Sequence, residues 1–170
     1  MKDLPIQQKF KNLVYPLNHG YARRFSTKSS LSIVIHTTGN AKITSFESEE
    51  KHLFHSRHVS THFLVSRDGR IIQHLPTDIF AAWHAGATTK IDYSNQRTIG
   101  IEMHHSVPDE PLQEQKDLAA KLCQELMKKH TIREIVMHRT IAKPKGRKID
   151  PTNFTDHDFN EWVRRLRKDM

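Results

Sequence analysis

The sequence predicts a single domain of the α/β class, in which strands and helices alternate along the chain. Its 170 residues are enough to build one hydrophobic core without disulfides or oligomerisation. Short runs of β-branched residues, such as residues 31–36, alternate with segments that carry apolar residues at helical spacing, such as residues 112–126. No internal repeat or low-complexity segment is present, so we expect no second domain.

The first half of the chain predicts a basic N-terminal stretch followed by a strand, a helix and a hairpin. Residues 1–28 carry scattered apolar residues among basic ones, which favours one short helix and then a loop. Residues 31–36 form a near-continuous apolar run typical of a buried strand. Apolar residues indicate a helix within residues 42–56. Two strands, residues 61–66 and 70–74, flank an Arg-Asp-Gly sequence, in which Asp-Gly marks a tight turn.

The second half of the chain continues the alternation. Residues 98–104 predict a strand. A helix is expected to follow, with Asp109 as its N-cap and Pro111 in its first turn. Residues 134–138 predict another strand, and the apolar residues near the C-terminus line one side of a last helix.

The chain is strongly basic, with a net charge of +8 and an isoelectric point near 9.7. Such a charge indicates a polyanionic partner, and we expect the basic ends to dock on an anionic envelope surface; ordinary solvated surface charge is the alternative. Specific nucleic-acid binding is not expected, because no base-reading or RNA-stacking motif is present. The basic residues gather in three clusters: Lys2, Lys9, Lys11, Arg23, Arg24 and Lys28; Lys143, Lys145, Arg147 and Lys148; and Arg164, Arg165, Arg167 and Lys168.

The composition also predicts the compartment and the oligomeric state. No apolar run approaches the ~18 residues that can span a bilayer, so no transmembrane segment is expected. The first residues contain no hydrophobic stretch of a secretory signal, which favours a cytoplasmic location at synthesis. The single Cys123 cannot form an internal disulfide, and we expect it to pack within a helix. We expect a monomer.

Two of the 13 histidines, together with one aspartate, form a candidate metal site. His36 follows an Ile-Val-Ile run, His138 follows an Ile-Val-Met run, and Asp150 comes after a basic loop broken by proline and glycine. Two imidazoles and a carboxylate at the same end of neighbouring strands would leave a fourth position open, as in a catalytic zinc site. The alternative for either histidine alone is a hydrogen-bonded core residue. Three histidines at helical spacing are expected on the surface: His52, His55 and His58.

Five segments, in order along the chain, resemble the motifs of the zinc N-acetylmuramoyl-L-alanine amidase family. This family includes phage endolysins of the T7-lysozyme type, cell-wall-recycling amidases and peptidoglycan recognition proteins. The resemblance covers roughly residues 30–155 and implies a central mixed β-sheet flanked by helices, with a groove over one face. The matching segments are Ile-Val-Ile-His-Thr-Thr at 33–38, the hairpin at 60–69, Ala-Trp-His-Ala-Gly at 82–86, Ile-Gly-Ile-Glu at 99–102, and His138 through Lys-Ile-Asp-Pro at 148–151.

The sequence departs from the family pattern at three places. The resemblance does not reach the N-terminal stretch, so we divide the chain into a basic extension at residues 1–29 and an amidase domain at residues 30–170. The loop before Asp150 is about two residues longer than usual. Thr61 stands where T7-type lysins carry a catalytic tyrosine, which argues against a mechanism that needs a phenol.

The resemblance implies a role for each site residue. One Zn²⁺ per chain would be bound by His36, His138 and Asp150. Glu102 would be the general base, because the apolar residues 99, 101 and 103 occupy the opposite face of its strand; a structural salt bridge is the alternative. Lys148 would stabilise the oxyanion, or else is a solvated loop lysine. Three residues are candidates for binding or orienting the substrate: His84, Trp83, for which core packing is the alternative, and Thr37.

These roles predict an enzyme that cleaves the amide bond between N-acetylmuramic acid and L-alanine in peptidoglycan. We expect a phage-type endolysin, stored in the cytoplasm and acting on the cell wall after release. Two alternatives remain open at this point. The first is an intracellular recycling amidase that acts on soluble muropeptides. The second is a peptidoglycan-binding module without activity, although the intact ligand set argues against it.

Overall fold

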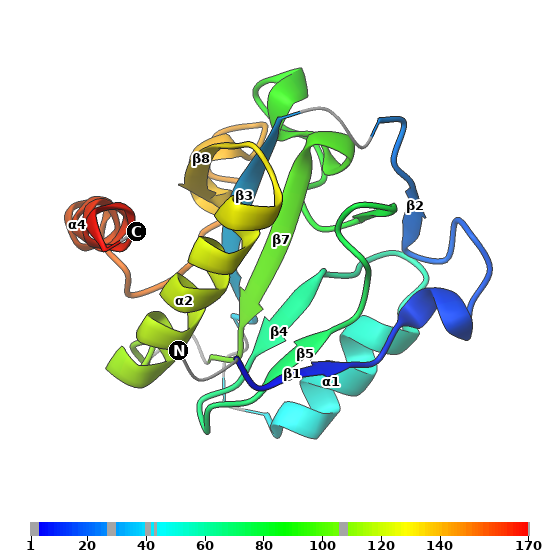
Figure 1. The fold of residues 1–170 in the computed structure, drawn as a ribbon, viewed down its shortest axis with the longest axis horizontal. Coiled ribbons are helices and arrows are strands. Elements are labelled where there is room, and N and C mark those ends of the chain that lie inside the picture. Colours follow the sequence, from blue (N-terminus) through cyan, green and yellow to red (C-terminus); the bar gives the residue numbers. More distant parts are fainter. Residues whose placement is uncertain (1–3, 27–29, 40–41, 43, 106–108, 170) are drawn as a thin grey trace.

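A six-stranded mixed β-sheet forms the centre of the protein, in the strand order β1-β5-β4-β7-β3-β8 (Figure 1). The computed structural model describes residues 4–26, 30–39, 42, 44–105 and 109–169. Strands β3, β4, β7 and β8 run parallel, whereas β4 and β5 form the expected antiparallel hairpin. The strands of this sheet are β1 (Ile6–Gln8), β3 (Leu31–Thr37), β4 (Phe63–Val65), β5 (Ile71–Gln73), β7 (Thr98–Met103) and β8 (Ile132–Met137). The central mixed sheet predicted from the sequence is therefore confirmed.

Four α-helices and a small β-ribbon complete the described structure. Strands β2 (Tyr21–Arg23) and β6 (Phe80–Ala82) pair antiparallel outside the main sheet. The helices are α1 (Phe46–His55), α2 (Gln113–Lys129), α3 (His138–Ile141) and α4 (Asp156–Lys168), and three short 3₁₀ turns lie at Lys11–Leu13, Ile91–Tyr93 and Asn95–Arg97. In the described parts of the chain, no helix is long and apolar enough to cross a membrane.

The two faces of the sheet have different roles because successive side chains of a strand point to opposite faces. Ile33 and Ile35 of β3 and Ile101 of β7 belong to the main core, which α2 and α4 cover. His36 and Glu102 alternate with these residues and therefore lie on the other face. Helix α1 covers part of that second face, where its residues pack on β4 and β5 in a cluster of Phe46, Leu53, Leu64 and Ile72.

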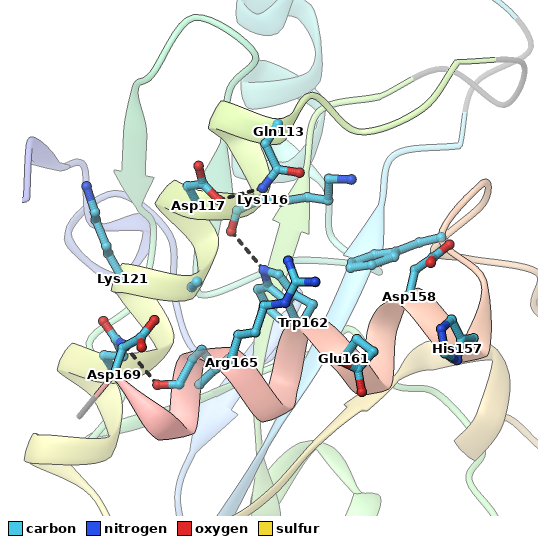
Figure 2. Close-up of a pocket in the computed structure, with 14 residues that line it drawn as sticks. Gln113, Lys116, Asp117, Lys121, His157, Asp158, Glu161, Trp162, Arg165 and Asp169 are labelled. Carbon is cyan, nitrogen blue, oxygen red and sulfur yellow. Dashed lines mark hydrogen bonds between the residues drawn. The ribbon is translucent and has the colours of Figure 1, made fainter.

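Helix α4 is fixed against α2 by side-chain contacts (Figure 2). The indole Nε1 of Trp162 donates a hydrogen bond of 3.1 Å to the carbonyl of Lys116. Nε2 of Gln124 donates one of 2.8 Å to the carbonyl of Leu166. A pocket of about 570 Å³ lies between the two helices. None of the predicted site residues lines this pocket. The basic residues near the end of α4, Arg164, Arg165, Arg167 and Lys168, are exposed.

The described part of the N-terminal stretch contains only one 3₁₀ turn, Lys11–Leu13, where a short helix was expected, and it also forms two strands that were not expected. Its residues Ile6–Gln8 instead pair in parallel with β5, and Tyr21–Arg23 pairs with β6. The reason is tertiary: β5 would otherwise present an unpaired edge, and β1 supplies its hydrogen-bonding partner. This stretch thus contributes one strand to the main sheet and one to the β2–β6 ribbon.

Two basic residues of the N-terminal cluster are buried, so they cannot dock on an envelope as expected. The ammonium of Lys11 donates hydrogen bonds to the carbonyls of Leu53, at 3.3 Å, and Ser56, where α1 ends. The guanidinium of Arg24 donates bonds of 2.7 Å to three carbonyls, those of Thr77, Gln96 and Thr98. Lys9 is paired with Glu50 at 3.0 Å. Lys2 and Lys28 lie outside the described residues.

The start of α2 differs from the expectation. Leu112 is its N-cap, and no side chain caps the first turn. Asp109 and Pro111 therefore precede the helix. A proline restricts the residue before it to extended conformations, so the helix is not expected to begin before Pro111, and it begins at Gln113.

Candidate metal and catalytic site

The predicted metal ligands come together at one end of two neighbouring parallel strands. His36 lies near the end of β3, and His138 directly follows β8, which pairs with β3. Asp150 reaches the same point, with its Oδ2 3.1 Å from Nδ1 of His36 and 3.0 Å from Nδ1 of His138. One ligand atom from each residue lies within 4.8 Å of the others. The structure therefore brings the predicted triad together.

Contacts of Arg139 hold the segment of Asp150 in this position. The backbone N–H of Arg139, the residue after His138, donates a 2.8 Å hydrogen bond to the carbonyl of Asp150. The guanidinium of Arg139 donates to the carbonyls of Pro151 and Phe154 and pairs with Asp156 at 2.8 Å. The segment that carries the aspartate is thus fastened to the end of β8, beside the histidine ligand.

The protonation of the ligands fits a bound cation. Nε2 of His138 lies 3.0 Å from the carbonyl oxygen of Ala85, which can only accept a hydrogen bond, so Nε2 carries a proton and Nδ1 is the nitrogen left to bind a metal. Burial lowers the pKa of His36 to about 4, so this ring is neutral at pH 7. Unprotonated ring nitrogens repel the carboxylate oxygen that they face, and a cation bound between the nitrogens and the oxygen removes this repulsion. The nitrogen and oxygen donors suit zinc.

A groove of about 710 Å³ opens over the triad. Glu102 lines it from β7, at the register position directly beside His36 on β3. Burial raises the pKa of Glu102 well above its ordinary value, and the negative charges of Asp150 and Glu49 add to this, whereas Lys148 acts in the opposite direction. A divalent cation at the triad would also favour the charged carboxylate.

Lys148 lines the groove from the loop before Asp150 and is exposed to solvent. The adjacent Arg147 fastens this loop to the segment after His84. Its Nε donates to the carbonyl of Lys143 at 2.9 Å, and one terminal nitrogen donates to the carbonyls of Ala85, at 3.1 Å, and Ala87, at 2.8 Å. The longer loop is therefore anchored beside the site.

The residues predicted to contact substrate have different positions. His84 lines the groove, and its Nδ1 lies 2.9 Å from Nε2 of His36. Thr37 also lines the groove, but its hydroxyl is buried and accepts the backbone N–H of Thr152 at 3.2 Å. Trp83 does not line the groove; its backbone N–H donates to Ser60 Oγ at 3.0 Å. The substrate contacts of these residues stay predictions.

Two polar residues near the site were not singled out by the sequence. Oδ1 of Asn95 accepts the backbone N–H groups of His84, at 3.1 Å, and Ala85, at 2.9 Å. Thr98 Oγ1 lies 3.0 Å from Nε2 of His84. A single asparagine in a 3₁₀ turn and a threonine at a strand start carry no sequence signal for such roles, because their contacts depend on how the segment between β6 and β7 folds back.

A known protein family matches most of the chain. The family model of N-acetylmuramoyl-L-alanine amidases (Amidase_2) matches residues 27–153. The chain belongs to this family, and membership supports amide hydrolysis in peptidoglycan as its activity. Among curated proteins, no sequence matches the chain.

Solved structures share the whole fold at low sequence identity. A selenomethionine derivative of AmpD is 22% identical, with a TM-score of 0.70, and the match covers 95% of this chain and 94% of that chain. Staphylococcus aureus AmiA, solved with its ligand, is 18% identical with a TM-score of 0.72, covering 98% and 82%. The Clostridium intestinale endolysin amidase LysCS is 20% identical with a TM-score of 0.64, covering 95% of each chain. At these identities the likeness concerns the fold.

Proposed function

We propose that the protein is a zinc-dependent N-acetylmuramoyl-L-alanine amidase, which hydrolyses the bond between the lactyl group of N-acetylmuramic acid and L-alanine. The observation that carries the proposal is the convergence of acceptor atoms from His36, His138 and Asp150 within 4.8 Å beside the groove. Family membership supports the substrate class. Zinc held by these residues would supply Lewis-acid chemistry, which polarises a carbonyl and lowers the pKa of water.

The chain's own residues supply the proton transfer and the charge stabilisation. No hydrogen bond joins the Glu102 carboxylate to another residue in the described parts of the chain, so it is free to take a proton from water and deliver it to the leaving amine. Its raised pKa favours that second step, because the protonated carboxyl is then populated closer to neutral pH. The ammonium of Lys148 offsets the negative charge that develops on the scissile carbonyl oxygen.

Metal analysis of single variants tests the zinc site. We expect the purified protein to bind one zinc, and His36→Ala or His138→Ala to lose both the metal and the turnover of a soluble muropeptide. His157→Ala, in which an exposed histidine of α4 is replaced, is the control and should keep both. A chelator should also lower the unfolding temperature of the wild type, because metal binding stabilises the folded state. Full zinc occupancy in either ligand variant would overturn the assignment.

Within this activity we propose action on the intact cell wall, as expected of an endolysin. The exposed basic residues of α4 support this proposal because the wall is polyanionic, and one of the similar structures is an endolysin. The test is zymography on purified walls, with and without chelator, beside turnover of soluble muropeptides. Activity on soluble muropeptides alone would indicate a recycling amidase, and wall binding without hydrolysis would indicate a recognition module.

A further inference from the structure

The hydrogen bonds around His84 form a continuous chain that ends at the metal site. Thr98 Oγ1 donates to the carbonyl of Ser94 at 2.9 Å and lies 3.0 Å from Nε2 of His84. On the other side of the ring, Nδ1 of His84 lies 2.9 Å from Nε2 of His36. Nδ1 of His36 in turn faces Asp150. Each contact in this chain is short enough to be a hydrogen bond.

The chain determines where each proton lies. Thr98 has a single hydroxyl proton, which goes to the Ser94 carbonyl, so its oxygen must accept the Nε2 proton of His84. A neutral imidazole carries one ring proton, so a His84 ring protonated at Nε2 has a bare Nδ1. This Nδ1 accepts the Nε2 proton of His36, which leaves Nδ1 of His36 bare toward Asp150. The bare nitrogen is the one that binds a metal.

The next residue along the chain, Ala85, orients the second histidine ligand. Its carbonyl accepts the Nε2 proton of His138 at 3.0 Å. The backbone N–H groups of His84 and Ala85 both donate to Oδ1 of Asn95. The consecutive residues His84 and Ala85 thus accept the Nε2 protons of the two histidine ligands. The side chain of Asn95 holds both of these residues in place.

We propose that the His84–Ala85 segment, held by Asn95 and Thr98, sets the tautomers of both metal-binding histidines. Asn95 and Thr98 are then positioning residues, and His84 acts through His36. The inference rests on the proposed function for the identity of the metal. Groups that orient histidine ligands typically contribute roughly 10–100-fold to metal affinity.

The first test measures zinc affinity, by competition with a chelator, in conservative variants of the full chain. Thr98→Val removes the hydroxyl at nearly constant volume and should weaken zinc binding by roughly 10–100-fold, whereas Thr98→Ser should restore it. Asn95→Leu should weaken binding similarly, and Asn95→Asp, which keeps the acceptor, should not. Thr61→Val is the matched control, because this buried hydroxyl also bonds backbone carbonyls, those of Phe63 and Gly100, and not a histidine ring.

The second test reads the tautomers of the metal-free wild type by ¹⁵N NMR of the imidazole rings. We expect His36, His84 and His138 each to carry the proton on Nε2. A proton on Nδ1 of His36, or zinc affinity in Thr98→Val equal to that of Thr61→Val, would overturn the inference. If the wild type does not bind zinc, the proposed function fails, while the NMR measurement still decides the tautomers. The wild-type spectrum also keeps the test decisive if a variant does not fold.

Discussion

Replacing Gly100 by alanine would add a methyl group at the point where β7 passes the ring of His84. A Cβ at this position would lie 2.7 Å from Cγ of His84 and 2.9 Å from its Cδ2 and Nδ1. The ring cannot move aside freely, because both its nitrogens and its backbone N–H are hydrogen-bonded. From the sequence alone, this position is only a glycine within a predicted strand, and the contact with His84 is not visible.

The expected cost follows from two opposing effects. Alanine in place of glycine at an unstrained position stabilises a protein by about 0.4–1 kcal/mol, through the entropy of the unfolded chain. Inserting a methyl group into a packed contact costs about 1–3 kcal/mol, and displacing His84 would break hydrogen bonds in addition. We therefore expect Gly100→Ala to lower the free energy of unfolding by about 1–3 kcal/mol. Zinc affinity should fall as well, because His36 loses its acceptor.

Urea unfolding in the presence of a chelator measures the stability change without a contribution from the metal. A double-mutant cycle with His84→Ala isolates the cause. Once the ring is absent, Gly100→Ala should be neutral or stabilising. An equal loss of stability in both backgrounds, or a Gly100→Ala protein as stable as the wild type with unchanged zinc affinity, would refute the reasoning.

Three further predictions concern the base, a buried lysine and the surface charge. Glu102→Gln should lower kcat roughly 10²–10⁴-fold with zinc retained, and near wild-type turnover would exclude Glu102 as the base. Burial lowers the pKa of Lys11 from 10.5 to about 8, so the unfolded chain binds more protons between these values. The wild type should then gain stability with rising pH across this window relative to Lys11→Met, and parallel unfolding curves would contradict this. Glutamine at Arg165, Arg167 and Lys168 should weaken wall binding at low salt only, with unchanged turnover of soluble muropeptide; a salt-independent difference would argue against docking by charge.

Much of the fold could be predicted from local patterns. The β-branched runs before His36 and His138 predict buried strands, and parallel strands place the residues at their ends along one edge of the sheet. The alternation around Glu102 correctly predicts that this residue faces away from the core that α2 and α4 cover. These features depend on the period of a strand, which the sequence carries directly.

The N-terminal stretch could not be predicted in this way. Its basic residues are typical of a solvated surface, yet Lys11 binds the carbonyls at the end of α1, and Arg24 binds three carbonyls from two other segments. A buried cation is stable only when partners distant in the sequence surround it. Local composition contains no information about such partners.

The sequence by itself therefore determined the candidate ligands His36, His138 and Asp150, and the strand face that carries Glu102. Tertiary structure alone decided which groups surround them. Asn95 and Thr98 are ordinary polar residues until the chain folds back and brings Oδ1 and Oγ1 within hydrogen-bonding distance of His84 and Ala85. The physical reason is that a ligand's residue type is written in the sequence, whereas its tautomer is set by hydrogen bonds that exist only in the folded chain.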